Sequence, residues 1–218
     1  MVVTFLQDKE PQRVQALIKR FKKSYRDDWT QWLALCGPDT SDRDKADCLH
    51  RTLRRWGALG RIPKARRAPI PAIEKLMVQA RRSLEGLRSF DVRDLADKEH
   101  HARCREPLCE LWELTGSIAR NSEDAHLVGR SKAVMLLTEG RFGPALDGKV
   151  CKNTFEGRFP PRAIRSCEIW LAALSEIARD IVAFETKYRT ALADLCDEKL
   201  AVGRIYDMAA GPQAGTQE

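Results

Sequence analysis

The chain has 218 residues, of which 43% are hydrophobic and 32% charged, with a formal net charge of +7 and a pI of about 9.1. This length suits one good-sized domain or two small ones, and the hydrophobic share is sufficient for a buried core. No apolar run approaches the roughly 18 residues that a membrane span requires, and the first residues do not have the pattern of a secretory signal. We therefore expect a cytoplasmic protein without a membrane partner.

The first part of the chain is predicted to form two helices and a loop. Apolar residues recur at steps of three and four over residues 11–36, which predicts one amphipathic helix that ends at Gly37-Pro38. Polar residues at positions 39–42 offer N-caps for a second helix, which continues to Trp56. The glycines and prolines of residues 57–71 predict a loop.

The rest of the chain is also predicted to be helical. Helices are expected at about 71–87 and at 92–114, the second after a cap at 89–91. Further helices are expected within residues 128–150, over much of 163–200, and at 204–210 after an interruption at Gly203. No run of strand-forming residues has a period of two. We therefore predict an all-α fold of about eight helices in a single domain, residues 1–209. Residues 1–60 are a candidate N-terminal subregion, residues 51–71 a basic loop, and residues 210–218 a disordered tail.

The positive charge is concentrated in one stretch. Residues 51–67 contain seven basic residues and no acidic one, so the remaining residues sum to about zero. Such a local surplus suits a polyanion, because neutralised phosphates release counterions. The alternative is a solvated linker that happens to be basic. The residues concerned are Arg51, Arg54, Arg55, Arg61, Lys64, Arg66 and Arg67.

The cysteines and tryptophans are predicted to be core residues. The seven cysteines are odd in number and form no C-x-x-C pair, so we expect reduced, buried side chains rather than a zinc or redox motif. The five tryptophans lie on apolar stripes and would stack on bases only if they were exposed.

The segment 128–150, VGRSKAVMLLTEGRFGPALDGKV, carries a candidate site. Gly129 allows a tight turn with free backbone N–H groups that suit a phosphate, and Ser131 is a candidate N-cap for the apolar helix that follows. Asp147 is expected at the start of the next helix, where a carboxylate suits the helix dipole. Lys132 and Asp147 are thus at opposite ends of a helix–turn unit, which can fold back and bring them together.

This segment resembles the core of the DNA glycosylases of the helix-hairpin-helix superfamily over residues 126–152. The resemblance implies that Gly129, Arg130 and Ser131 contact a nucleic-acid backbone. It also implies that Lys132 is the nucleophile that attacks the sugar of a flipped-out nucleotide and that Asp147 stabilises positive charge there. The segment departs from the family pattern in having one hairpin glycine, and in the simplest register the family's lysine falls on Ser131. The hypothesis is therefore a nucleic-acid-binding protein, with DNA favoured over RNA and with possible base-excision activity, that needs no cofactor.

Two other functions compete with this hypothesis. Arg120 and His126 have the Arg-x5-His spacing that resembles the motif of HEPN-type ribonucleases, in which such residues assist cleavage of RNA. A helical interaction module without chemistry is the other alternative. His100, His101, Cys104 and Cys109 lie one helical turn or more apart with acids nearby, but no metal is expected there. Arg204 and Asp207, at i and i+3, are expected to form a structural salt bridge.

Overall fold

A computed structural model describes residues 3–37, 39–59, 63–119, 127–156, 160 and 166–213 of the chain. Over these residues the protein is all-α: it contains helices and two isolated β-bridges but no strand. The nine α-helices in the described residues are α1 (Pro11–Lys19), α2 (Lys23–Ala34), α3 (Asp42–Arg55), α4 (Ile70–Gly86), α5 (Lys98–Leu114), α6 (Leu127–Leu137), α7 (Gly148–Phe155), α8 (Cys167–Tyr188) and α9 (Val202–Ala210). Among these helices none is both long and apolar enough to cross a membrane.

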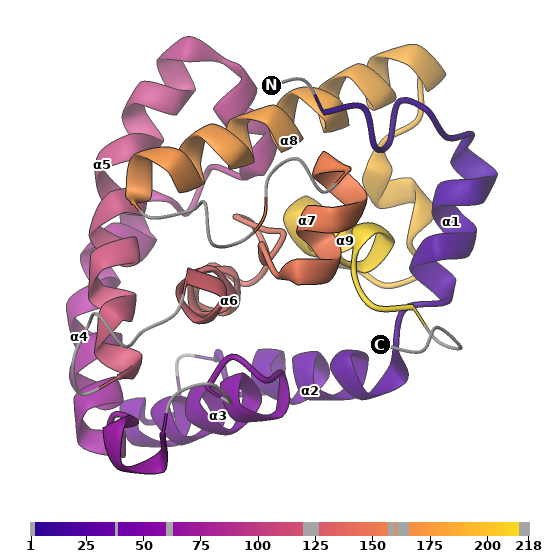
Figure 1. Cartoon of the computed structure of the whole chain (residues 1–218). Coiled ribbons are helices and arrows are strands. Elements are labelled where there is room, and N and C mark those ends of the chain that lie inside the picture. The colour runs from indigo at the N-terminus through magenta and orange to yellow at the C-terminus, as the bar shows by residue number, and fades with distance from the viewer. Residues whose placement is uncertain are drawn as a thin grey trace.

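Helix α6 lies in the middle of the molecule, as Figure 1 shows, with α2 and α3 on one side and α5 and α8 on others. Its residues are buried almost all round, which suits a helix without a polar face. Val134 belongs to the hydrophobic cluster that α5, α8 and α9 share, whereas Met135 and Leu136 belong to the cluster of α2, α3 and α4. Because α6 contributes to both clusters, its polar residues Ser131 and Lys132 are buried.

The predicted helix over residues 11–36 is wrong in one respect: it is two helices, α1 and α2, separated at residues 20–22. Phe21 is buried between them and forms an isolated bridge with Gln213, while the N–H of Lys22 donates to the carbonyl of Pro212 at 3.2 Å. The apolar period is the same on both sides of this break. The backbone groups that leave the helix therefore find partners in the distant C-terminal segment, which a local pattern does not reveal.

The other helices mostly follow the prediction. Ser41 caps α3 by accepting a hydrogen bond from the N–H of Asp44 at 3.1 Å. The predicted helix over 92–114 is a 3-10 turn (Val92–Ala96) followed by α5, because Asp91 and Asp97 each cap a separate start. Within the predicted 163–200 stretch, α8 ends at Tyr188 and a 3-10 turn follows at Leu192–Leu195.

The C-terminus departs from the prediction of a disordered tail over 210–218. Gly203 does not interrupt the last helix but lies in α9, which runs to Ala210. Gln213 is buried, and its side chain donates to the carbonyls of Met208 and Gly211. The chain is therefore packed at least to Gln213, and residues 214–218 lie outside the described residues.

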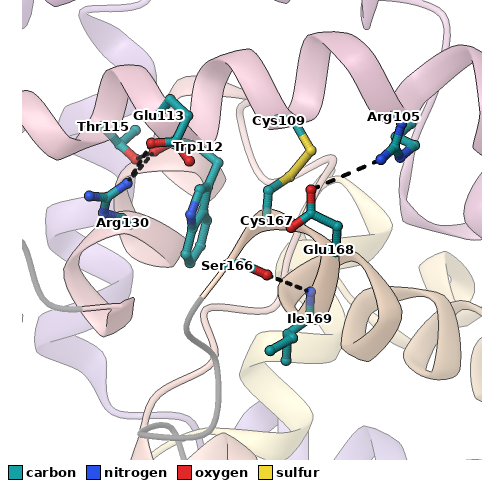
Figure 2. The surroundings of a disulfide bond; sticks show 10 residues. All are labelled: Arg105, Cys109, Trp112, Glu113, Thr115, Arg130, Ser166, Cys167, Glu168 and Ile169. Carbon is teal, nitrogen blue, oxygen red and sulfur yellow. Dashed lines mark hydrogen bonds and ion pairs between the residues drawn. A yellow bond between two sulfur atoms is a disulfide. The ribbon is translucent and has the colours of Figure 1, made fainter.

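The expectation that all cysteines are reduced is wrong for one pair. Cys109 on α5 and Cys167, the first residue of α8, form a disulfide (Figure 2). Ser166 caps the start of α8 by accepting a hydrogen bond from the N–H of Ile169, and Glu168 lies 4.0 Å from Arg105 on α5. The start of α8 is thus held to α5 by a covalent bond and an ion pair. The remaining cysteines, Cys36, Cys48, Cys104, Cys151 and Cys196, are free thiols.

Candidate functional site

The amine of Lys132 is buried and has two partners. Its Nζ donates a hydrogen bond to the carbonyl oxygen of Trp56 at 2.8 Å and lies 3.4 Å from Oδ2 of Asp147. Trp56 is the C-cap of α3, where backbone carbonyls lack helical partners and a positive charge is favourable. The side chain is 7% exposed. Lys132 therefore joins the end of α3 to the carboxylate of Asp147.

Asp147 is the N-cap of α7, as predicted. Its Oδ1 accepts hydrogen bonds from the N–H groups of Lys149 and Val150, both at 3.0 Å, so its other oxygen faces Lys132. The side chain is 18% exposed, more than that of Lys132. A carboxylate with this arrangement is oriented from two directions, by the α7 backbone and by the amine. The structure thus brings together the two residues on which the base-excision hypothesis depends.

The residues just before Lys132 differ from the prediction. Gly129 and Ser131 lie inside α6, so Gly129 is not at a turn with free N–H groups and Ser131 is not an N-cap. A Cβ on Gly129 would come within 3.0 Å of Ile118 and 3.3 Å of the carbonyl of Ala58, so this glycine permits a close helix contact. The tertiary packing of α6 decides its conformation here, and Gly129 is buried rather than presented to a ligand.

Ser131 nevertheless contributes to the site. Its hydroxyl donates to the carbonyl of Val128 at 3.1 Å and accepts a hydrogen bond from the N–H of Leu146 at 3.2 Å. Leu146 directly precedes Asp147, so adjacent residues of α6, Ser131 and Lys132, contact adjacent residues of the segment that leads into α7. The family's lysine position falls on Ser131 in the simplest register, and the chain's own lysine is Lys132. Both residues therefore contact this segment.

Arg130 lies at the edge of α6 and binds to α5. Its guanidinium donates to the carbonyl of Trp112 at 3.2 Å, lies 3.4 Å from a carboxylate oxygen of Glu113, and stands over the Trp112 ring (Figure 2). The side chain is 12% exposed in these contacts. These contacts are all with protein groups, and the predicted contact of Arg130 with a phosphate stays a prediction.

A second buried ion pair adjoins Lys132 and Asp147. Arg204 and Asp207 on α9 lie 2.5 Å apart, which confirms the predicted salt bridge, and the guanidinium also donates to the carbonyl of Tyr25 at 3.2 Å. The rings of Phe21, Trp29 and Trp56 surround the guanidinium at 4.7–5.4 Å. These aromatic contacts favour a buried cation.

The carboxylate of Asp207 has unusual acid–base behaviour. Burial raises its pKa to about 6, against the opposing effect of Arg204; the negative charge of Asp147 raises it further, and the positive charge of Lys132 lowers it. The four charged side chains therefore act on one another. We call Lys132, Asp147, Arg204 and Asp207 the central charge cluster. The i, i+3 spacing of Arg204 and Asp207 was visible in the sequence, but their position beside Lys132 was not.

The basic stretch lies mostly on the surface. Arg54, Arg55, Lys64 and Arg66 are exposed and Arg67 is half-buried, whereas Arg61 lies outside the described residues. Arg55 pairs with Asp28 at 2.6 Å and Arg51 with Asp47 at 2.9 Å. Burial lowers the pKa of His50, and the positive charges of Arg54 and Arg67 lower it further, while the negative charge of Asp47 opposes them.

The tryptophans are core residues, as predicted: all five are buried, so none presents a free ring for base stacking. They are Trp29, Trp32, Trp56, Trp112 and Trp170.

Nothing in the described residues gathers three side chains suited to a metal ion. Near the histidine pair, Cys104 is buried, Cys109 is in the disulfide, and His100 lies 3.2 Å from Asp94. Arg120 and His126, on which the ribonuclease hypothesis depends, lie outside the described residues.

Comparisons with known proteins add no relative. No protein-family model matches the chain, and neither curated proteins nor solved structures include one with significant similarity to it. The functional argument therefore depends on the residues themselves.

Proposed function

We propose that this chain binds nucleic acid, with DNA favoured over RNA, through the basic surface formed by the end of α3 and by residues 64–67. The observation that carries this proposal is the exposure of Arg54, Arg55, Lys64 and Arg66 within a stretch that contains no acidic residue. Phosphate contacts by such side chains supply affinity that does not depend on sequence and weakens with salt.

The double variant Arg54→Glu/Lys64→Glu tests this surface. We expect weaker binding to duplex DNA and a slope of log K against log salt that is smaller by about 2, since each lost phosphate contact removes about 0.9. The double variant Arg88→Glu/Lys98→Glu is the control, because it changes the net charge equally at exposed positions elsewhere. Binding that is flat with salt, or equally weakened in both variants, would contradict the proposal and favour the interaction module.

The contact between Lys132 and Asp147 favours a second, more specific proposal: base excision at this pair. The amine would attack C1′ of a flipped-out deoxynucleotide, the bond from C1′ to the base would break, and the base would leave with a proton. The C1′–O4′ bond would then break, with the proton from the attacking nitrogen passing to O4′, so that the protein remains joined to the ring-opened sugar as a Schiff base; its protonated, iminium form is reduced by borohydride to a stable amine. Since Nζ donates to Trp56 in the described structure, the amine must lose a proton and leave that carbonyl before it reacts.

Borohydride trapping on duplexes that carry damaged bases tests this chemistry. We expect a covalent adduct with the unmodified chain and none with Lys132→Ala, whereas Lys149→Ala, a control at a lysine two residues after Asp147, retains it. Adducts from all three proteins would show reaction at surface amines, and no adduct at all would remove the base-excision proposal and leave the binding proposal.

An assay of RNA cleavage tests the ribonuclease alternative, because Arg120→Ala and His126→Ala should each abolish cleavage if that alternative is right.

A cytoplasmic location is also part of the proposal. The disulfide between Cys109 and Cys167 weighs against it, since disulfides persist mainly in oxidising compartments.

A further inference from the structure

The segment that carries Asp147 is held at successive residues. The N–H of Ala145 donates to Oδ1 of Asp207 at 3.2 Å, the N–H of Leu146 donates to the hydroxyl of Ser131 at 3.2 Å, and the side chain of Asp147 contacts Lys132. Two of these anchors come from α6 and one from α9. Asp207 is therefore bonded to the backbone two residues before the carboxylate that faces the amine.

Helix α9 also packs against the same connection with no space for a side chain. A Cβ on Gly203 would lie 2.4 Å from the backbone nitrogen of Gly143 and 2.6 Å from the carbonyl oxygen of Gly140. Backbone atoms on both sides cannot yield as a flexible side chain can. The position of α9, and of Asp207 on it, is thus defined relative to the segment that leads to Asp147.

Charge connects Asp207 to the same pair. The charged groups that face it are Arg204 on α9, Lys132 on α6 and Asp147 at the start of α7. The pKa of Arg204 is lowered chiefly by burial; Arg26 on α2 lowers it further, and Glu198 before α9 raises it. Arg26 and Glu198 form an ion pair with each other. In this environment the pKa of Asp207 is about 6, so its charge changes within a range that can be measured on the folded protein.

We propose that Asp207 is a positioning residue of the Lys132–Asp147 site: it holds the backbone that presents Asp147, and its negative charge competes with that of Asp147 for the amine of Lys132. The functional importance of this role rests on the proposed base-excision chemistry. The arrangement itself does not require nucleic acid, so it can be measured separately.

The measurement is an NMR titration of the folded chain without nucleic acid, following the side-chain amine of Lys132 and the carboxyl carbons of Asp147 and Asp207. The Lys132 signal is assigned from its absence in Lys132→Arg. We expect the Lys132 and Asp147 signals to show an inflection within about one pH unit of the titration of Asp207. An Asp207 whose charge does not act on the amine would leave the Lys132 signal flat in this range, and a flat signal overturns the proposal.

Two variants make the result specific. The inflection should disappear in Asp207→Asn and persist in Asp180→Asn, which removes another fully buried carboxylate that binds the N–H groups of Leu6 and Gln7 instead. An unchanged inflection in folded Asp207→Asn contradicts the proposal. If that variant does not fold, Asp207→Glu replaces it: a retained carboxyl should keep the inflection but shift its midpoint, and an unmoved midpoint counts against the proposal.

The outcome is separable from that of the borohydride experiment. Coupled titration without any covalent adduct supports the positioning role and removes the proposed chemistry. An adduct that depends on Lys132, with Lys132 insensitive to Asp207, removes the positioning role and leaves the chemistry.

Discussion

Two junctions hold distant parts of this chain together, and they use different forces. At the α5–α8 junction one covalent bond joins Cys109 to Cys167, 58 residues apart in sequence. At the α6–α7–α9 junction the central charge cluster and the contact between Gly143 and Gly203 join three separate segments without a covalent bond. A disulfide stabilises mainly by restricting the unfolded chain, whereas buried charges depend on every partner being present in the folded one. The second junction should therefore be the more sensitive to single substitutions and to pH.

The largest effect is expected for Arg204→Met, which keeps most of the side-chain volume but leaves the carboxylate of Asp207 buried without its partner. Removing one member of a buried ion pair typically costs about 3–5 kcal/mol. Urea unfolding followed by circular dichroism measures it. The exposed Arg54→Met is the control, with an expected change within about 0.5 kcal/mol. Equal losses in both variants would show that the cluster contributes no more than a surface charge.

Removing the disulfide with Cys109→Ser/Cys167→Ser is expected to lower the free energy of unfolding by up to about 4 kcal/mol, from the entropy of a loop of this length. Reduction of the unmodified chain should have the same effect, while Cys196→Ser, at a free thiol, should have little. The Lys132 signal should be unchanged in the folded variant. A changed signal would mean that the two junctions are not independent.

The two junctions should also differ in how the free energy of unfolding depends on pH, because Asp207 belongs to the second junction. An unfolded aspartate titrates near 3.9 and folded Asp207 at about 6, so between these values the folded chain holds a proton that the unfolded chain has lost. The contribution of Asp207 is thus fully present below pH 4 and decreases as the pH rises to 6, by about 3 kcal/mol. The difference in unfolding free energy between the unmodified chain and Asp207→Asn should change over this range. A difference that is constant with pH means that Asp207 titrates normally.

Gly203→Ala tests the uncharged part of the second junction. The added methyl group would meet the backbone of Gly140 and Gly143, and such overpacking typically costs about 1–3 kcal/mol. Gly148→Ala at the start of α7 is the matched control, because a Cβ there has no atom within 4 Å. Thermal unfolding of both variants compares them, and an equal Tm would show that the contact of α9 with this connection is loose.

Local patterns account for most of the helices. The N-cap signals at Ser41 and Asp147 and the apolar periods of α3, α4 and α8 were sufficient to place those elements. The patterns failed where a distant segment supplies the partner. Helix α1 ends before Phe21, which still fits the apolar period, because Phe21 and Lys22 pair with Gln213 and Pro212. Gly129 lies in α6, which is packed closely against Ala58 and Ile118.

The candidate site shows the same division. Residue types and spacing were enough to single out Lys132 and Asp147 and to pair Arg204 with Asp207, because each of these inferences concerns residues close in the chain. Three features are consequences of folding alone. The two pairs adjoin, Ser131 and Asp207 hold the segment before Asp147, and Cys109 meets Cys167. Helix periodicity and capping are properties of neighbouring residues, whereas burial, altered pKa values and long-range bonds exist only once separate segments have packed together.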